Sequence, residues 1–219
     1  MNVGTQTIIQ LGLLLISITV HEYMHGYAAF RLGDPTAKNA GRLSLNPIRH
    51  IDPFGTVLLP LLLSLGGGPI FGYAKPVPVN PRYFRDIRQG DLITGVAGPA
   101  ANLGLALVGA ALAWMALFAG AILGEGIAQW LYLIGVLLTQ TNLWLMFFNL
   151  IPIPPLDGSS VVPLFLNDRA LMKWYEMQKY SFGVLMVLLW GIPALTNFNP
   201  LGVYFSWTVE PLMALLLPG

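Results

Sequence analysis

The chain contains no cysteine, and charged residues are scarce. Without cysteine it can form neither disulfide bonds nor thiolate metal sites, and cysteine usage gives no indication of the redox compartment. Charged residues make up 10% of the 219 positions, whereas ordinary soluble domains have about 25%. There is also no basic run that could follow a phosphate backbone, so nucleic acid is not an expected partner. A hydrophobic content of 55% and a mean hydropathy of +0.66 indicate an integral membrane protein.

Several apolar segments are long enough to be membrane-spanning helices, which need about 20 largely apolar residues. The clearest cover 5–30, 91–121, 127–150 and 181–196, with 54–72 and 201–217 as weaker candidates. The first ten residues lack the basic region of a cleaved signal peptide, so we expect the first segment to be retained. The sequence predicts one all-α polytopic membrane domain over residues 1–219, with about 5–6 transmembrane or re-entrant helices.

Positive charge is concentrated in three connecting segments, at 31–53, 73–90 and 167–180. The positive-inside rule places these segments on the cytoplasmic side of the cell membrane. Segment 54–72 would then begin and end on one side, so either it re-enters the membrane, bending at LGGGP, or one basic segment lies outside. Proline and glycine in the flanking stretches 41–55 and 72–84 favour short extended or hairpin segments over helix.

Residues 21–25 read HEYMH, near the end of the first apolar segment. On a helix, His21 and His25 share one face and can reach a single metal ion. Glu22 lies about 100° round the helix, near enough to act as a general base on a metal-bound water. A charged side chain at the centre of a span costs about 2.5–3.5 kcal/mol, so such a cluster is functional by default. Imidazole nitrogens suit zinc, and we expect one zinc ion per chain.

A catalytic zinc usually has three protein ligands, so a further ligand is needed. His50, the remaining histidine, lies in a polar basic loop where a solvated histidine needs no special reason. Asp157 is the better candidate, because it follows a proline-imposed helix break on the same expected side of the membrane as the histidines. The alternative is that Asp157 caps a helix over 158–166.

Two further features lie close to these motifs. Asn149, at the helix break, could donate to a developing oxyanion or hold an extended substrate strand. It could equally satisfy carbonyl groups freed by Pro152 and Pro154. The small residues of 95–104 predict close helix packing, with Asn102 joining two helices, and we expect packing alone from this stretch.

Three motifs together resemble those of the site-2 proteases, the intramembrane zinc metalloproteases. They are HEYMH at 21–25, GPAAN at 98–102 and NLIPIPPLDG at 149–158. The resemblance covers essentially the whole chain and is to the small bacterial-type branch, with GRLSLNPIRHIDPFG and AKPVPVNP as further shared stretches. It implies His21, His25 and Asp157 as zinc ligands, Glu22 as general base, and Asn149 as a contact to substrate or oxyanion.

The resemblance has two departures. Ser159 stands where the family commonly has a second glycine after the Asp-Gly pair, which affects the local turn but not ligation by Asp157. We also expect the small form of the family, without a PDZ or CBS domain.

The expected activity is hydrolysis of a peptide bond within or near the transmembrane helix of a single-pass membrane protein. Zinc would lower the pKa of its bound water toward 7, and Glu22 would take the proton and pass it to the leaving amine. The substrate helix would unwind locally and pair with an extended segment around 72–80. Water would come from a cytoplasm-facing cavity.

Other classes of protein are alternatives. The chain could be a zinc-binding membrane protein without proteolytic activity, either a metal carrier or a pseudoprotease scaffold. A carrier should have further intramembrane carboxylates or histidines along a path, and the clear spans have almost none. A pseudoprotease usually loses its base, but Glu22 is intact. A purely structural membrane protein would leave the polar cluster unexplained.

Overall fold

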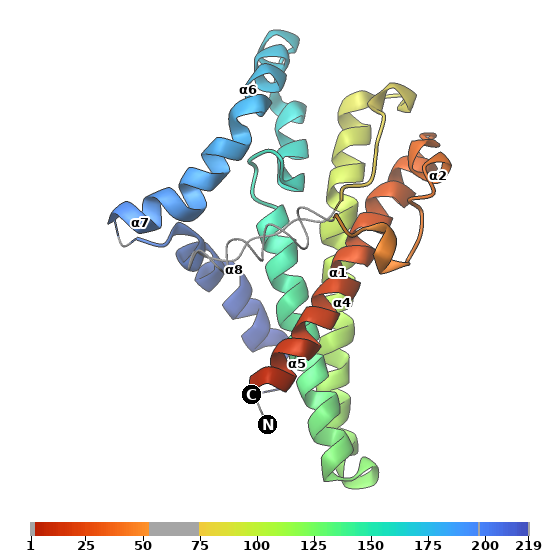
Figure 1. Cartoon of the computed structure of the whole chain (residues 1–219), viewed down its shortest axis with the longest axis vertical. Helices are drawn as coiled ribbons and strands as arrows, with labels where there is room; N and C mark the ends of the chain where they lie inside the picture. The colour runs from red at the N-terminus through yellow and green to blue at the C-terminus, as the bar shows by residue number, and fades with distance from the viewer. Residues whose placement is uncertain (1–2, 53–74, 197, 219) are drawn as a thin grey trace.

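The computed structural model describes residues 3–52, 75–196 and 198–218, and these residues form helices and no strands (Figure 1). Four helical stretches among them are long and apolar enough to cross a membrane. They are Gly4–Arg31, Ile87–Gly120, Glu125–Asn149 and Asp168–Thr196. The prediction of an all-α polytopic membrane protein is therefore confirmed, and the weaker candidate 54–72 lies outside the described residues.

Three long helices form the core of the described structure: α1 (Val3–Arg31), α4 (Ile87–Leu123) and α5 (Glu125–Asn149). All three contact one another. Helices α4 and α5 form an antiparallel hairpin, because Gly124 between them adopts a positive φ of 81° that ends one helix and starts the next. A Cβ atom on Gly135 would lie 2.7 Å from the Gly109 carbonyl oxygen, so these glycines let the two backbones touch.

A second pair of helices follows the hairpin. The chain runs through a 3₁₀ helix, η4 (Asp157–Phe165), into α6 (Asp168–Met186), a π-helical turn (Val187–Gly191) and α7 (Ile192–Thr196). In Figure 1 this continuous stretch slants away from the core, and α8 (Pro200–Leu216) returns to it. Helix α8 packs on α5, where the Phe205 and Trp144 rings stack at 4.6 Å.

The prediction of a connecting loop over 167–180 is wrong. Helix α6 already begins at Asp168 and covers almost all of this stretch. Asn167 caps it by accepting a hydrogen bond from the Ala170 N–H at 2.9 Å. The basic residues that suggested a loop lie instead on an exposed helical surface, which accommodates charge equally well.

The stretches predicted as extended or hairpin are non-helical over much of their described length. They contain two single-turn 3₁₀ helices, η1 (Pro47–Arg49) and η3 (Pro81–Tyr83), and follow a short helix, α2 (Thr36–Asn39). One backbone hydrogen bond, from Lys75 N–H to the His50 carbonyl at 3.0 Å, joins the two stretches. Residues 75–80 therefore lie as an irregular segment, which Pro76 and Pro78 keep from forming a helix.

Candidate metal centre

Three potential metal ligands meet where α1 approaches η4. His21 Nε2 lies 2.9 Å from His25 Nε2 and 3.0 Å from Asp157 Oδ2, and His25 Nε2 lies 3.3 Å from the same carboxylate oxygen. The two histidines are buried and the aspartate is partly buried. These residues form a group that could hold a metal ion.

Hydrogen bonds on the far side of each ring place a hydrogen on Nδ1, so that Nε2 is the nitrogen available to a metal ion. His25 Nδ1 lies 2.7 Å from the Thr94 carbonyl, which can only accept, so Nδ1 is the donor and Nε2 keeps a lone pair. His21 Nδ1 lies 2.5 Å from Asn102 Oδ1, which gives His21 the same tautomer. Asp157 Oδ2 is buried and has no hydrogen-bond donor among the described residues. In the neutral form of both rings, two imidazole lone pairs and one carboxylate oxygen thus converge on one point, an arrangement that a cation stabilises.

The donor set fits zinc. Two imidazole nitrogens and one carboxylate oxygen are a usual protein ligand set for a catalytic zinc site that keeps a fourth position open. A tetrahedral ion with bonds of about 2.0–2.1 Å has ligand atoms about 3.3 Å apart, and the separations of 2.9–3.3 Å are within a few tenths of this value.

Asp157 is positioned by close backbone packing and not by a capping role. Asp157 is the first residue of η4 and Leu156 occupies the cap position, so the capping alternative considered from sequence is not what the structure has. A Cβ on Gly158 would lie 2.2 Å from the Leu150 carbonyl oxygen, so the chain folds back tightly on the end of α5 at this point. On the α4 side, a Cβ on Gly95 would lie 3.1 Å from the Asp157 carbonyl oxygen.

The small-residue stretch of α4 forms one wall of the centre, contrary to the expectation of packing alone. A Cβ on Gly98 would lie 2.4 Å from His25 Nε2 and 2.6 Å from His21 Cε1. One turn further on, Asn102 accepts from His21. The sequence shows that Gly95, Gly98 and Asn102, spaced i, i+3 and i+7, share one helix face, but it does not show that this face lies against the histidines.

Glu22 faces a cavity of about 750 Å³ that also contains the three potential ligands. Its Oε2 accepts a hydrogen bond from the Val77 N–H at 2.9 Å. Segment 75–80 thus lies along the cavity and is fixed at two further points. The Asn80 N–H donates to Asp34 Oδ2 at 2.7 Å, and the Arg42 guanidinium donates to the carbonyls of Lys75 and Pro76.

The two remaining sequence candidates lie in different places. Asn149 lines the cavity, and its amide donates to the Leu145 carbonyl of its own helix at 2.9 Å. His50 is not in the ligand group. It is 1% exposed, and its Nε2 donates to the Ser44 carbonyl at 2.7 Å. The interpretation of His50 as a solvated loop residue is therefore wrong. Its ring is buried and joins two parts of the loop through the hydrogen bond to Ser44.

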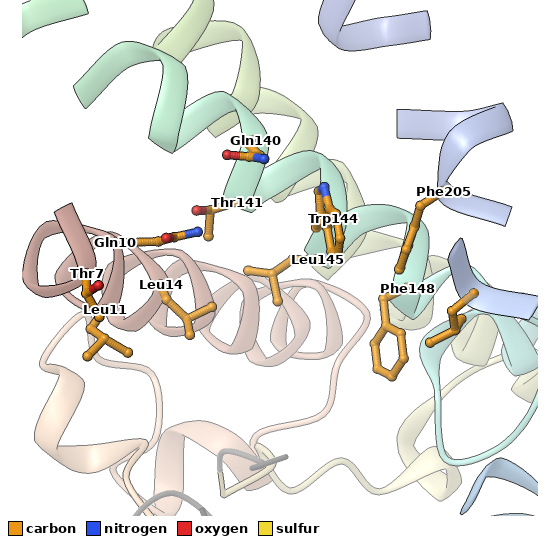
Figure 2. A pocket seen from close by; sticks show the side chains of 11 residues that line it. Thr7, Gln10, Leu11, Leu14, Gln140, Thr141, Trp144, Leu145, Phe148 and Phe205 are labelled. Atoms are coloured by element: carbon orange, nitrogen blue, oxygen red, sulfur yellow. The ribbon is translucent and has the colours of Figure 1, made fainter. Parts of the chain in front are cut away.

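A groove of about 560 Å³ lies beside the cavity, between α1, α5 and α8 (Figure 2). Its walls are mostly apolar, with the polar side chains of Gln10, Gln140 and Thr141 toward one end. Leu145 and Phe148 line both the groove and the metal-centre cavity. These two side chains are therefore the shared wall between the two spaces.

Comparison with known proteins gives a consistent identity. "Putative zinc metalloprotease YwhC" of Bacillus subtilis is 38% identical over 194 residues, which cover 89% of this chain and 82% of that relative. "Putative zinc metalloprotease Rip2" of Mycolicibacterium smegmatis is 32% identical over 177 residues, covering 80% of this chain and 64% of the relative. No family model and no solved structure matches the chain. The extent of the match to YwhC, together with the HEYMH helix, shows that the chain belongs to the site-2 protease family of zinc metalloproteases.

Proposed function

We propose that the protein is an intramembrane zinc endopeptidase that cleaves a peptide bond within or near the transmembrane helix of single-pass membrane proteins. The observation that carries this proposal is the convergence of His21, His25 and Asp157 on one point, beside Glu22, in a cavity at the end of a membrane-spanning helix. A metal centre in this position suits a reaction on substrates that arrive through the bilayer.

The residues divide the chemistry between them. His21, His25 and Asp157 would hold the zinc ion, which supplies a Lewis acid that polarises a carbonyl and lowers the pKa of water. Glu22, on the cavity wall, accepts a proton from the attacking water as its oxygen bonds to the peptide carbon. The same carboxyl group then gives that proton to the amine as the carbon–nitrogen bond breaks. Asn149, also on the wall, contacts the substrate or the developing oxyanion with the amide group that its helix does not fully use.

Segment 75–80 supports binding of an unwound substrate by strand addition. Pro76 and Pro78 have no N–H, whereas Val77 and Val79 do. In an extended chain, residues two apart direct their backbone groups to the same side. That side is the one on which Glu22 accepts from Val77. A substrate strand entering the cavity would pair with this edge and compete with Glu22 for the Val77 N–H.

The membrane supplies the substrate. The groove in Figure 2 shares Leu145 and Phe148 with the cavity, which supports lateral entry of a helix from the lipid between α1 and α8. The distribution of positive charge supports an orientation in the cell membrane with the metal centre toward the cytoplasm.

The test is cleavage by the purified full-length chain in lipid vesicles. A panel of single-span reporter proteins, each tagged differently at its two ends, serves as substrate. We expect cleavage within or near the span, loss of cleavage with a zinc chelator, and recovery on adding zinc. Glu22→Gln should retain zinc but cleave at least about 10³-fold more slowly. Cleavage at the wild-type rate by Glu22→Gln would contradict the mechanism. A zinc-loaded chain that cleaves no reporter would favour a non-proteolytic zinc protein.

A further inference from the structure

A chain of hydrogen bonds runs from the His21 ring through two buried asparagines to the backbone of α5. The His21 Nδ1–H donates to Asn102 Oδ1, and Asn102 Nδ2 donates to Asn142 Oδ1 at 2.8 Å. Asn142 Nδ2 in turn donates to the Leu138 carbonyl at 2.9 Å and to Ser17 Oγ at 2.9 Å. This chain of hydrogen bonds, called the relay below, joins α1, α4 and α5 directly behind the candidate metal centre.

The direction of every bond in this relay is fixed at its α5 end. The Leu138 carbonyl can only accept, so the Asn142 nitrogen must face it and the Asn142 oxygen must face Asn102. Ser17 reinforces this orientation, because its hydroxyl hydrogen is donated to the Leu13 carbonyl at 2.8 Å, which leaves an acceptor for the second Asn142 hydrogen. Asn142 can therefore present only an acceptor to Asn102.

This orientation passes along the relay to the metal centre. Asn102 must direct its nitrogen toward Asn142, so its oxygen faces His21 and accepts from Nδ1. Were the Asn102 amide reversed, an N–H would face Nδ1, and the ring hydrogen would move to Nε2, where it would block ligation. Asn102, Asn142 and Ser17 are all 0% exposed, so water cannot substitute for a lost partner.

We propose that Asn142 is a positioning residue for the metal centre, setting the tautomer and ring orientation of His21 through Asn102. The inference rests on the proposed zinc site and deepens it. Partners beyond the ligands themselves commonly change metal affinity by about 10–100-fold. Among the described residues, Asn142 has no hydrogen bond to the potential ligands, but its orientation determines that the oxygen of Asn102, and not its nitrogen, faces His21.

Thr139 provides a matched control on the same helix. Its hydroxyl lies 3.1 Å from the Ala106 carbonyl, so it also joins α5 to α4, and it is 0% exposed like Asn142. It takes no part in the relay. Thr139→Ala and Asn142→Ala therefore both remove a buried interhelical contact, but only the second releases the Asn102 amide.

The experiment measures the zinc dissociation constant of the full-length chain in detergent micelles by competition with a chelating dye. We expect Asn142→Ala to weaken zinc binding about tenfold or more, and Thr139→Ala to change it less than about twofold. In an Asn102→Ala background, Asn142→Ala should have no further effect on zinc binding, because its route to His21 is already removed. Equal zinc affinity for Asn142→Ala and wild type would overturn the proposal.

A second readout applies without zinc. Nitrogen-15 labelling of the three histidines reports by NMR which ring nitrogen of each carries hydrogen. Zinc-free wild type should have His21 protonated at Nδ1, and Asn142→Ala should convert part of it to the Nε2–H form. A wild-type His21 protonated at Nε2 would overturn the proposal. Failure of wild type to bind zinc would instead contradict the proposed function, so the two failures are distinguishable.

Discussion

The Val77 N–H donates to Oε2 of Glu22 at 2.9 Å, which ties the proposed general base to the segment proposed to receive the substrate. Val77 stands between two prolines and so carries the one backbone N–H of residues 76–78. This hydrogen bond therefore holds the proposed substrate-binding edge next to the proposed base. A substrate strand that pairs with this edge would compete for the same N–H.

Removing the acceptor should expose this link. In Glu22→Ala, the Val77 amide should exchange hydrogen about tenfold faster, because a hydrogen bond to a charged group worth about 1.5 kcal/mol is lost. Mass spectrometry of a peptide over residues 75–80 measures it with few overlapping amides, since Pro76 and Pro78 have none. The Asn80 amide, which is bound to Asp34, serves as the internal control and should keep its rate. Unchanged exchange at Val77 would contradict the contact.

Arg42 should determine whether the whole segment stays in place. Its guanidinium bonds to the carbonyls of Lys75 and Pro76, so Arg42→Ala should speed exchange across residues 75–80 and raise the KM for a cleaved reporter more than it lowers kcat. Arg49→Ala is the matched control, because Arg49 bonds to the Gly41 carbonyl at 2.6 Å and not to this segment. Equal effects of the two substitutions would argue against a specific role for Arg42.

Gly98 should be intolerant of a side chain. Gly98→Ala would place a methyl group 2.4 Å from His25 Nε2, displacing a ligand and weakening zinc binding by about 100-fold. Gly104, on the same helix, has open space around the added atom, so Gly104→Ala should bind zinc as wild type does. The zinc dissociation constants of both variants check the prediction, and retention of tight binding by Gly98→Ala would refute the packing argument.

The turn that carries Asp157 should depend on Gly158 but not on its neighbour. Gly158→Ala forces a methyl group to within 2.2 Å of the Leu150 carbonyl oxygen, and backbone cannot move aside as a flexible side chain would. We expect it to lose zinc and to unfold at a lower temperature. Ser159→Ala should do neither, because the turn is held at this position by a backbone hydrogen bond, from the Ser159 N–H to the Leu156 carbonyl at 3.0 Å, which alanine keeps. Thermal unfolding and zinc content, measured on both variants, decide the matter.

The helices and the potential ligands could be predicted because each depends on local signals. Long apolar runs predicted α1, α4 and α5, and His21 and His25 share a helix face through their spacing alone. The roles of Asn102 and His50 could not be predicted in the same way. A polar residue looks alike in sequence whether it joins two helices, orients a ligand or ties a loop, and only the packing of distant segments distinguishes these cases. The part of α6 over 168–180 was predicted as a loop, because exposed charged residues are typical of both loops and helix surfaces.

The zinc content of the unstripped, purified protein tests the central claim most directly. Wild type and His50→Ala should each contain about one zinc per chain, whereas His25→Ala and Asp157→Ala should contain almost none. His50 is the matched control, because it is a buried histidine that lies outside the ligand group. Zinc retained in full by Asp157→Ala, or absent from the wild-type protein, would contradict the account.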